Sequence, residues 1–441
     1  MSTNYGSWSG GSAEYGSVHG LTGLEAVLSP MRKPMQELVK TKAMGWKLFK
    51  EGSFKVDGDR YLRIPLQIRL SAAFSGVAEN GPLPRAGRSG YAEAKAPVVE
   101  VYSALQMSAL SEAITRAGSV PINTPRDEMK GIATSFAGNL DRMLFGFSSG
   151  KIVKVKSVTE IAAPVYTITV ATDQTDVFAD TAPLFAGMRV AWGTAAELGS
   201  GVTGADGHGE VKHVTDSTNF IVEVLDGTTI PAADDYFVCG DDTTHSYGRE
   251  FVGLREMIDN TATIQGLDPA SANYPFWVVN RYQANGGGAA ITLQLPHLMA
   301  ACIKHGKMFD GEPVPDTIVC RPEIAIEYFD ILYPNQRFSP GKFAGTGVSP
   351  DELDWNYAGK RLKWLYSPKS MANKLLFMER GYFTYGWLEK PGWVTNRNNG
   401  FITEPVPGVN ARRGYYGAIG QFVTTDRRRI TTLEDINHST L

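Results

Sequence analysis

The chain has 441 residues and a formal net charge of −3, with 43% hydrophobic and 20% charged residues. A chain of this length can bury one large core or two to three separate ones, and its 10% aromatic content excludes disorder as a description of the whole chain. No apolar stretch is long enough to predict a transmembrane helix, and we expect no secretory signal. Three widely spaced cysteines predict free thiols rather than a disulfide framework or a zinc site: Cys239, Cys302 and Cys320.

The small net charge hides an uneven distribution. Between Ser157 and His245, two basic residues stand against 14 acidic ones, so this segment carries −12 and the remainder +9. Two sections of opposite charge are expected to meet different surroundings. A solvated acidic domain beside a mildly basic one is the equally open alternative.

The first part of the chain predicts an extended arm and a long hairpin. Residues 1–20 hold Gly and Ser with isolated aromatic residues, a composition that is usually mobile in a monomer. Residues 52–107 predict extended segments, because apolar and polar residues alternate from Leu62 onward. The Gly- and Pro-containing tip, 76–90, has no core-forming pattern. A hairpin this long without a core beneath its tip usually lies on a partner.

A helix and then a β-rich segment follow. Thr124 is a predicted N-cap, with Pro125 and Asp127 in the first turn, and an apolar stripe at helical spacing predicts about 20 helical residues ending near Gly146. Short β-branched runs between turns then predict five to seven strands of a small antiparallel barrel or sandwich. The runs are 166–170, 188–191, 210–214, 219–224 and 236–239.

Mixed α/β character returns after residue 245. Ile291, Leu295, Leu298, Met299 and Cys302 predict one helix face. A buried strand is predicted at 317–320, a helix that opens at Arg321-Pro322, and later aromatic-rich strands at 361–366, 374–377 and 415–423.

Two motifs that suggest chemistry lack the structural context that the chemistry requires. Gly146–Gly150 matches the G-x-S-x-G pattern of hydrolases with Ser148 as the nucleophile, but a helix precedes it and an extended run follows, the reverse of the required order. Gly199–Gly204 matches G-x-G-x-x-G, but the residues after it cannot start a stable helix. A helix-terminal turn and a flexible loop are the better readings.

Candidate metal and histidine sites are also weak. Asp206, His208 and Glu210 would share one face of a strand, with His213 nearby, but no further ligand stands at a fixed spacing. His297 and His305 are better read as packed or capping side chains. The sequence offers no active site, and we expect no metal and no cofactor.

Basic residues outside the acidic segment occur singly or in short groups without a nucleic-acid-binding motif. Weak contact with phosphates and a solvated basic surface are equally open. The groups include Arg32-Lys33, Lys40/Lys42, Lys47/Lys50, Arg412-Arg413 and Arg427–Arg429.

The order of these parts, together with several local sequences, resembles the major capsid proteins of tailed bacteriophages, which have the α+β Hong Kong 97-type fold. The local sequences are FVGLREMIDN at 251–260, IQGLD at 264–268, YPFW at 274–277, the strand and helix at 316–331 and a strand at 375–383. The resemblance covers roughly residues 30–150 and 246–430. Residues 151–245 depart from it and would form an inserted β-rich domain.

The resemblance implies a division of the chain into six parts. These are an N-terminal arm (1–50), an E-loop hairpin (51–107), a peripheral domain with a spine helix (108–150), the acidic insertion domain (151–245), an axial domain (246–390), and peripheral strands with a C-terminal tail (391–441).

The resemblance also implies a structural, non-enzymatic function. Many copies would form hexamers and pentamers of an icosahedral phage head around double-stranded DNA, with assembly in the host cytoplasm. Expected partners are other copies, portal and scaffolding proteins, a decoration protein and packaged DNA in non-specific contact, with no membrane. The alternatives are an encapsulin-like compartment shell and a serine hydrolase that uses Ser148. The tip lacks a lysine, so covalent cross-linking of the shell is not expected.

Specific side chains are expected at these contacts. Contacts between subunits are assigned to Phe74, Glu79, Arg85 and Arg88 on the hairpin and to Trp8, Tyr15 and Trp46 on the arm. DNA-facing basic residues are expected at Arg32, Lys33, Lys40, Lys42, Arg427, Arg428 and Arg429. The basic side chains of residues 30–60 and 427–429 should lie inside the shell, and the insertion domain outside it.

Overall fold

The computed structural model separates into two compact units. Unit 1 comprises residues 1–47, 100–140 and 387–420, and unit 2 comprises 48–99, 141–386 and 421–441. The structure describes residues 39, 42–52, 54–56, 60–69, 75–77, 81, 83, 85, 87–108, 124–174, 176–199, 205–225, 229–241, 244–271, 274–306, 314–332, 354–394, 403–406, 408 and 410–437.

A five-stranded sheet and a long helix run through both units. The sheet has the order β1-β18-β20-β19, and β5 also pairs with β20. The strands are β1 (Lys50–Gly52), β5 (Val99–Ser108), β18 (Phe383–Trp393), β19 (Thr403–Pro405) and β20 (Ala411–Thr424). Helix α5 (Thr124–Phe145) begins at the predicted cap and has 22 residues, and within unit 1 its Phe136 packs edge-on against Tyr416 of β20. The predicted helix is confirmed.

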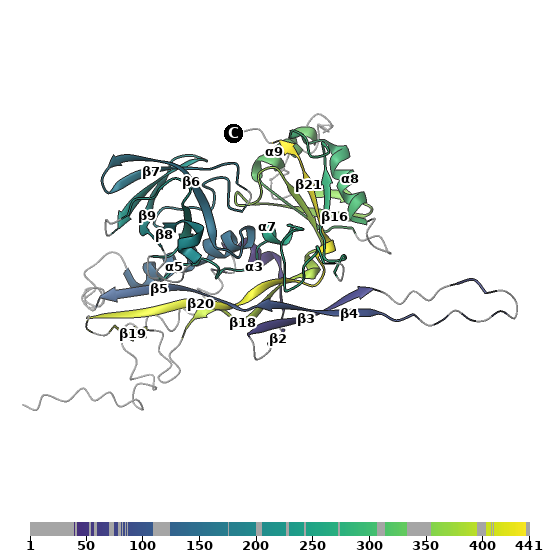
Figure 1. Cartoon of the computed structure of the whole chain (residues 1–441), viewed down its shortest axis with the longest axis horizontal. Helices are drawn as coiled ribbons and strands as arrows, with labels where there is room; N and C mark the ends of the chain where they lie inside the picture. The colour runs from purple at the N-terminus through teal and green to yellow at the C-terminus, as the bar shows by residue number, and fades with distance from the viewer. Residues whose placement is uncertain are drawn as a thin grey trace, which may run out of the picture. The chain divides into compact units, whose positions relative to one another are not determined.

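The hairpin forms a separate three-stranded antiparallel sheet in unit 2. Its strands are β2 (Lys55–Val56), β3 (Tyr61–Arg69) and β4 (Gly90–Pro97), with β3 in the middle. Leu62, Ile64 and Leu66 are buried, and the residues between them are exposed. The predicted alternation is therefore confirmed. Figure 1 shows β3 and β4 side by side as a ribbon.

The acidic segment folds into a closed six-stranded barrel in which every strand pair is antiparallel. Its strands are β6 (Lys151–Ala162), β7 (Val165–Val170), β8 (Arg189–Gly193), β9 (Gly207–Val214), β10 (Asn219–Leu225) and β11 (Tyr236–Cys239), with helix α6 (Ala195–Gly199) after β8. Trp192, Phe220 and Phe237 fill its centre with ring centroids 5.4–5.5 Å apart. All five predicted runs are strands, so the barrel prediction is confirmed.

The barrel strands include basic residues that lie before the acidic segment counted in the sequence. Residues 151–239 contain five basic and 12 acidic residues, so they carry −7 and leave +4 for the rest of the chain. The charge contrast between the barrel and the remainder is therefore real but smaller than the segment from Ser157 to His245 indicates.

The mixed α/β part of unit 2 is a six-stranded sheet of order β12-β21-β17-β14-β16-β15, with two helices on one face. The strands are β12 (Asn280–Gln283), β14 (Thr317–Cys320), β15 (Asp354–Tyr357), β16 (Lys360–Tyr366), β17 (Leu375–Met378) and β21 (Ile430–Glu434), and the helices are α8 (Leu295–Gly306) and α9 (Pro322–Leu332). Smaller elements are α3 (Met44–Leu48), α7 (Leu254–Met257), β13 (Ile291–Thr292), β22 (Ile436–Asn437), η4 (Arg380–Tyr382) and η5 (Arg427–Arg429). No helix among the described residues is long and apolar enough to cross a membrane.

The helix predicted from Ile291 onward begins later, and only some of its apolar residues are buried. Ile291 belongs to β13, which pairs with β22, and α8 starts at Leu295 because Pro296 suits the first helical turn. Leu298 and Cys302 are buried, whereas Leu295 and Met299 are exposed. The prediction that Ile291 shares this helix face is wrong, because Ile291 lies in β13 before the helix.

Candidate functional site

The base of the hairpin is held in a socket formed by a segment about 200 residues further along the chain. Leu62, Ile64 and Leu66 form one buried cluster with Leu267 and Trp277. The Trp277 indole Nε1 donates a hydrogen bond to the main-chain oxygen of Ile264, 3.1 Å away. The socket belongs to the 264–277 region whose sequence carried the capsid resemblance, so those motifs have a structural task in this chain.

Arg427 also binds the main chain of the socket segment. Its side chain is fully buried, and its guanidinium donates hydrogen bonds of 2.7–2.9 Å to the main-chain oxygens of Met257, Asp259 and Trp277. Burial lowers the pKa of Arg427 to about 10. The expectation that Arg427 faces DNA is wrong, because every part of its side chain is used inside the protein.

The two basic residues that follow Arg427 form ion pairs within the chain. Arg428 pairs with Asp426 at 2.9 Å, and Arg429 pairs with Glu379 at 2.8 Å; both arginines are partly buried. Their charges are thus largely balanced within the chain. Lys42 is exposed and its Nζ donates to the hydroxyl of Thr134 at 3.0 Å. The other three predicted DNA-facing residues, Arg32, Lys33 and Lys40, lie outside the described residues.

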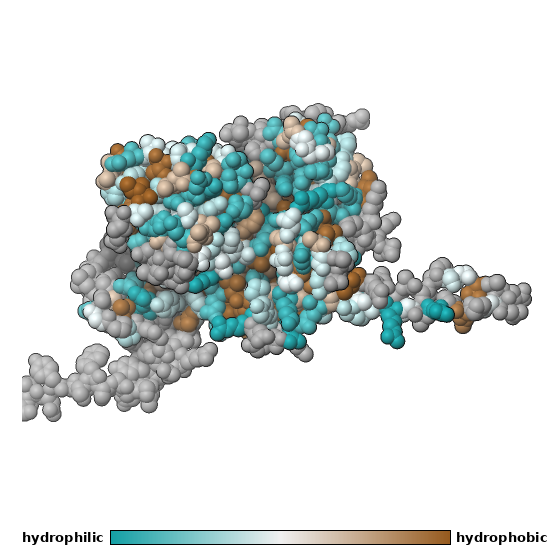
Figure 2. All heavy atoms as spheres, in the orientation of Figure 1, coloured by the Kyte–Doolittle hydropathy of each residue, from teal (hydrophilic) through white to brown (hydrophobic). Residues whose placement is uncertain are grey.

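The hairpin tip presents apolar and basic side chains to solvent. Leu83 is 83% exposed, and Tyr91, at the start of β4 beside the tip, is 72% exposed. Arg85 and Arg88 are exposed too, and no ion pair with either is found among the described residues. Figure 2 shows hydrophobic atoms on the described part of the ribbon's far end. Phe74 and Glu79 lie outside the described residues.

Trp46 has a different surrounding from the one that the sequence suggested. Its side chain is 3% exposed and packs edge-on against Trp387, with ring centroids 6.0 Å apart. The assignment of Trp46 to a contact between subunits is therefore wrong, since its own chain already covers it. Trp8 and Tyr15 lie outside the described residues.

Ser148 lies in the turn where the chain enters the barrel. Helix α5 precedes it and β6 follows, as the sequence predicts, and its main-chain nitrogen and hydroxyl both donate to the carboxylate of Glu256, at 2.6 and 2.9 Å. The carboxylate thus accepts one hydrogen bond from the hydroxyl and one from the main chain of this turn. Nothing in this geometry resembles a nucleophile raised on a strand-to-helix turn.

The entry and exit of the barrel are joined by a buried ion pair that the sequence did not reveal. Arg142 and Glu250 are both about 1% exposed and form a two-pronged contact of 2.6 and 2.8 Å. The main-chain nitrogen of Gly248 also donates to the oxygen of Ser149 at 2.8 Å. The chain segments before and after the barrel therefore lie side by side.

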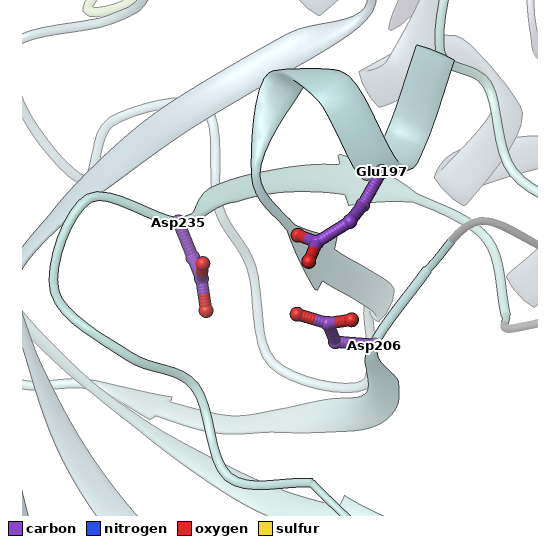
Figure 3. A group of neighbouring side chains, drawn as sticks. All are labelled: Glu197, Asp206 and Asp235. Atoms are coloured by element: carbon purple, nitrogen blue, oxygen red, sulfur yellow. The ribbon is translucent and has the colours of Figure 1, made fainter. Parts of the chain in front are cut away.

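Three carboxylates of the barrel approach one another: Glu197, Asp206 and Asp235 point together in Figure 3, with oxygen atoms within 4.8 Å. Burial raises the pKa of Asp206 and of Asp235. Two of the three already have local tasks, because Glu197 accepts from the nitrogen of Thr194 and Asp235 from the nitrogen of Ala232, both at 2.7 Å.

The metal candidates considered from the sequence are not brought together. Of that set only Asp206 joins the carboxylate group, while Glu210 pairs with Lys212 at 3.3 Å. His208 and His213 lie on β9 and are not members of that group of three. Most of the glycine-rich loop, 200–204, lies outside the described residues. His305 is fully buried between Thr431 and Glu379, at 2.8 and 3.3 Å, as expected of a packed histidine.

Comparison with known proteins gives a fold. No family model and no curated protein sequence matches the chain. The capsid asymmetric unit of cyanophage A-1(L) is similar over 90% of this chain and 93% of that one, at 11% identity and a TM-score of 0.50. Weaker likenesses are the capsid of the native GTA particle (TM-score 0.44, 9% identity, 90% of both chains) and the SrpI encapsulin of Synechococcus elongatus PCC 7942 (TM-score 0.38, 7% identity, 90% and 89%). The chain therefore has a phage capsid fold.

Proposed function

We propose that this chain, with its phage capsid fold, is a major capsid protein that assembles into hexamers and pentamers of an icosahedral head around double-stranded DNA. The observation that carries the proposal is the hairpin, which is anchored at its base in the Trp277 socket and exposes apolar and basic residues at its tip. An isolated monomer gains no stability from exposing this apolar surface, so the tip is suited to contact with another subunit. Assembly would take place in the host cytoplasm, and the finished protein would reside in the virion.

The strength of assembly comes from many contacts rather than from a few strong pairs. An exposed ion pair to Arg85 or Arg88 would contribute at most about 1 kcal/mol. A stable protein interface, in contrast, buries about 800 Å² on each partner. The hairpin supplies long β edges as well as side chains, and an unpaired edge readily accepts another strand.

The parts of the capsid fold are assigned to the chain as the resemblance implies. The hairpin is the E-loop, α5 is the spine helix of the peripheral domain, and the sheet with α8 and α9 is the axial domain. The barrel is an insertion domain on the outer surface, which the adjacency of its entry and exit at Arg142 and Glu250 supports. The protein is not an enzyme and has no cofactor.

Several partners follow from this assignment. Portal and scaffolding proteins would act during assembly, and a decoration protein would bind the barrel. Packaged DNA would meet the inner wall in weak, sequence-independent contacts, for which Lys42 remains a candidate together with Arg32, Lys33 and Lys40.

An encapsulin-like shell with protein cargo is the second candidate, because it would use the same fold. The acidic barrel argues for a phage head, since a compartment shell needs no such outer domain. The Ser148 hydrolase is disfavoured, because the Ser148 hydroxyl donates to Glu256 in a capped turn.

Electron microscopy of the expressed full chain, alone and with phage assembly factors, tests the proposal. We expect closed shells of uniform size, and DNA rather than a cargo enzyme in shells purified from infected cells. A monodisperse monomer under all conditions would contradict the proposal. Protein cargo without DNA would favour the encapsulin-like alternative.

A further inference from the structure

Strand β6 is longer than the part of it that closes the barrel. Its first residues pair with β11, and the main chain of Val155 still forms hydrogen bonds of 2.8 and 3.0 Å with Asp235 and Asp234. Beyond Val155 the strand continues to Ala162, and among the described residues its only neighbouring strand there is β7. Residues 156–162 therefore have one open edge.

The register with β7 tells which main-chain groups of β6 face this edge. In an antiparallel sheet, alternate residues direct both of their main-chain groups to the same neighbouring strand. The nitrogen of Val170 donates to Thr218, which directly precedes β10, so the even-numbered residues of β7 face β10. They lie opposite Val158 and Glu160 of β6. The N–H and C=O groups of these two residues therefore face away from β7, towards the open edge.

This edge lacks the residues that commonly block strand addition. Exposed edges often carry lysine or proline, whereas residues 157–162 contain neither. Three of the six residues are β-branched, which suits a strand, and Ile161 among them is 55% exposed. Irregular pairing before Ser157 and after Glu160 limits the regular part of the edge to a few residues. The edge is thus open but short.

We propose that this edge pairs with the same edge of a second copy of the chain, an inference that rests on the proposed shell function. The antiparallel register centred on Thr159 gives the longest overlap of the two open segments. It sets Val158 opposite Glu160 of the partner subunit, so that outward-facing main-chain groups meet and exchange two hydrogen bonds in each such pair. Thr159 then lies opposite Thr159 of the partner subunit, which is a favourable cross-strand pair.

The charges on the edge suit a contact between two copies. Antiparallel order brings the end with Lys156 in one copy beside the end with Glu160 in the other, and both side chains are exposed. A contact between identical edges is isologous and joins copies in pairs, whereas a ring of five or six needs a heterologous contact. We therefore assign the paired edges to barrels of neighbouring capsomers.

The size of the contact and the charge of the barrel indicate when it forms. So short an edge buries far less than the about 800 Å² per partner that a stable pair of proteins needs. Two barrels with an excess of acidic residues also repel each other. The isolated chain should therefore not dimerise through this edge. The contact forms in the shell, where other contacts already hold the copies side by side.

Disulfide cross-linking in assembled shells tests the inference. Residues of a non-hydrogen-bonded pair have Cα atoms about 4.5 Å apart, within the range that a disulfide spans. We expect Thr159→Cys shells treated with diamide to give covalent dimers, and no larger multimers, on a non-reducing denaturing gel. Thr167→Cys, opposite Thr159 on β7 and one strand further from the contact, is the matched control. It should remain monomeric, as should the unmodified chain with its native cysteines.

A proline at the edge tests whether the main chain makes the contact. Adding Glu160→Pro to Thr159→Cys removes an N–H group that faces the open edge and leaves the ladder with β7 intact. Since each contact loses two hydrogen bonds, the yield of dimers should fall about tenfold. Adding Glu160→Ala instead should preserve the dimers. A yield that the proline leaves unchanged would overturn strand pairing.

The remaining outcomes separate this inference from the proposed function. Intact Thr159→Cys shells without dimers would overturn this inference alone. A cross-link from Thr159→Cys to a different virion protein would also overturn it, because the occupant of the edge would then not be a second copy. Failure of the unmodified chain to form shells would overturn the proposed function as well.

Discussion

The barrel and the hairpin are both antiparallel β-structure, yet they solve the problem of exposed strand edges in opposite ways. The barrel closes on itself, so each of its six strands has two neighbours, and it fills its centre with Trp192, Phe220 and Phe237. The hairpin sheet stays open: β2 and β4 are edge strands, β4 makes one main-chain hydrogen bond of 2.9 Å from Lys95 to Gln265, and the sheet packs against a socket made by residues 264–277. A closed sheet is self-sufficient, whereas an open one depends on what it packs against.

The largest expected effect is at the joint between the barrel and the rest of unit 2. Arg142→Met should lower the free energy of unfolding by about 3–5 kcal/mol, because it leaves the Glu250 carboxylate buried without its partner. The double variant Arg142→Met/Glu250→Met should recover most of that loss. Urea denaturation measures both variants. If the barrel is stable without support from the rest of the unit, hydrogen exchange of β7 and β10 should change little in Arg142→Met. Rapid exchange there would show that the barrel, like the hairpin, depends on its neighbours.

A smaller loss is expected when the base of the hairpin is weakened. Ile64→Ala should cost about 2–4 kcal/mol locally, since Ile64 is fully buried in the socket cluster. Hydrogen exchange of β3 and β4 should rise while that of the barrel stays the same. Gln67→Ala, at an exposed position of the same strand, is the control and should change little. Equal exchange in both variants would show that the socket does not hold the hairpin.

The hairpin tip should affect assembly without affecting the isolated chain. Leu83→Asp should change the free energy of unfolding by less than about 0.5 kcal/mol, because Leu83 is 83% exposed. Shell formation, measured by sedimentation, should nevertheless fall sharply. Leu83→Met keeps the apolar side chain and is the matched control. Normal shells from Leu83→Asp would remove the tip from the proposed interface.

The smallest effect concerns acid and a single turn of the barrel. Hydrogen bonds from Asn219 and Thr218 lower the pKa of Asp216 to about 2. Since the folded pKa lies below the unfolded one, the stabilisation is complete above pH 4, approximately, and is lost as the pH falls towards 2. Asp216→Asn should flatten this part of the acid response, measured as hydrogen exchange of β9 and β10. An unchanged acid response would contradict the assignment.

The sequence predicted the elements well where the signal is local. The barrel strands appear as short β-branched runs between turns, the hairpin as strict alternation, and α5 as a cap followed by an apolar stripe. Each of these patterns depends only on residues close together in the sequence, so it predicts the secondary structure without knowledge of distant contacts.

What the sequence could not predict depends on distant partners. Arg427 looks like one of three surface arginines, because the carbonyl groups that bind it lie about 150–170 residues away and have no side-chain signature. Arg142 and Glu250 are separated by 108 positions in the same way. Helix α8 has apolar residues on so much of its circumference that its pattern could not indicate which face meets the sheet.

The paired entry and exit of the barrel have a consequence for how such chains can diversify. Because Ser149 and Gly248 are joined by a main-chain hydrogen bond of 2.8 Å, the roughly one hundred residues between them form a cassette whose two ends meet. A recombination event, or a protein engineer, can exchange that cassette for a tight turn or a foreign domain without stretching the backbone on either side. The new segment would have to replace the contacts of Arg255 with the main chain of Val177 and of Arg321 with Asp180, which the present cassette supplies.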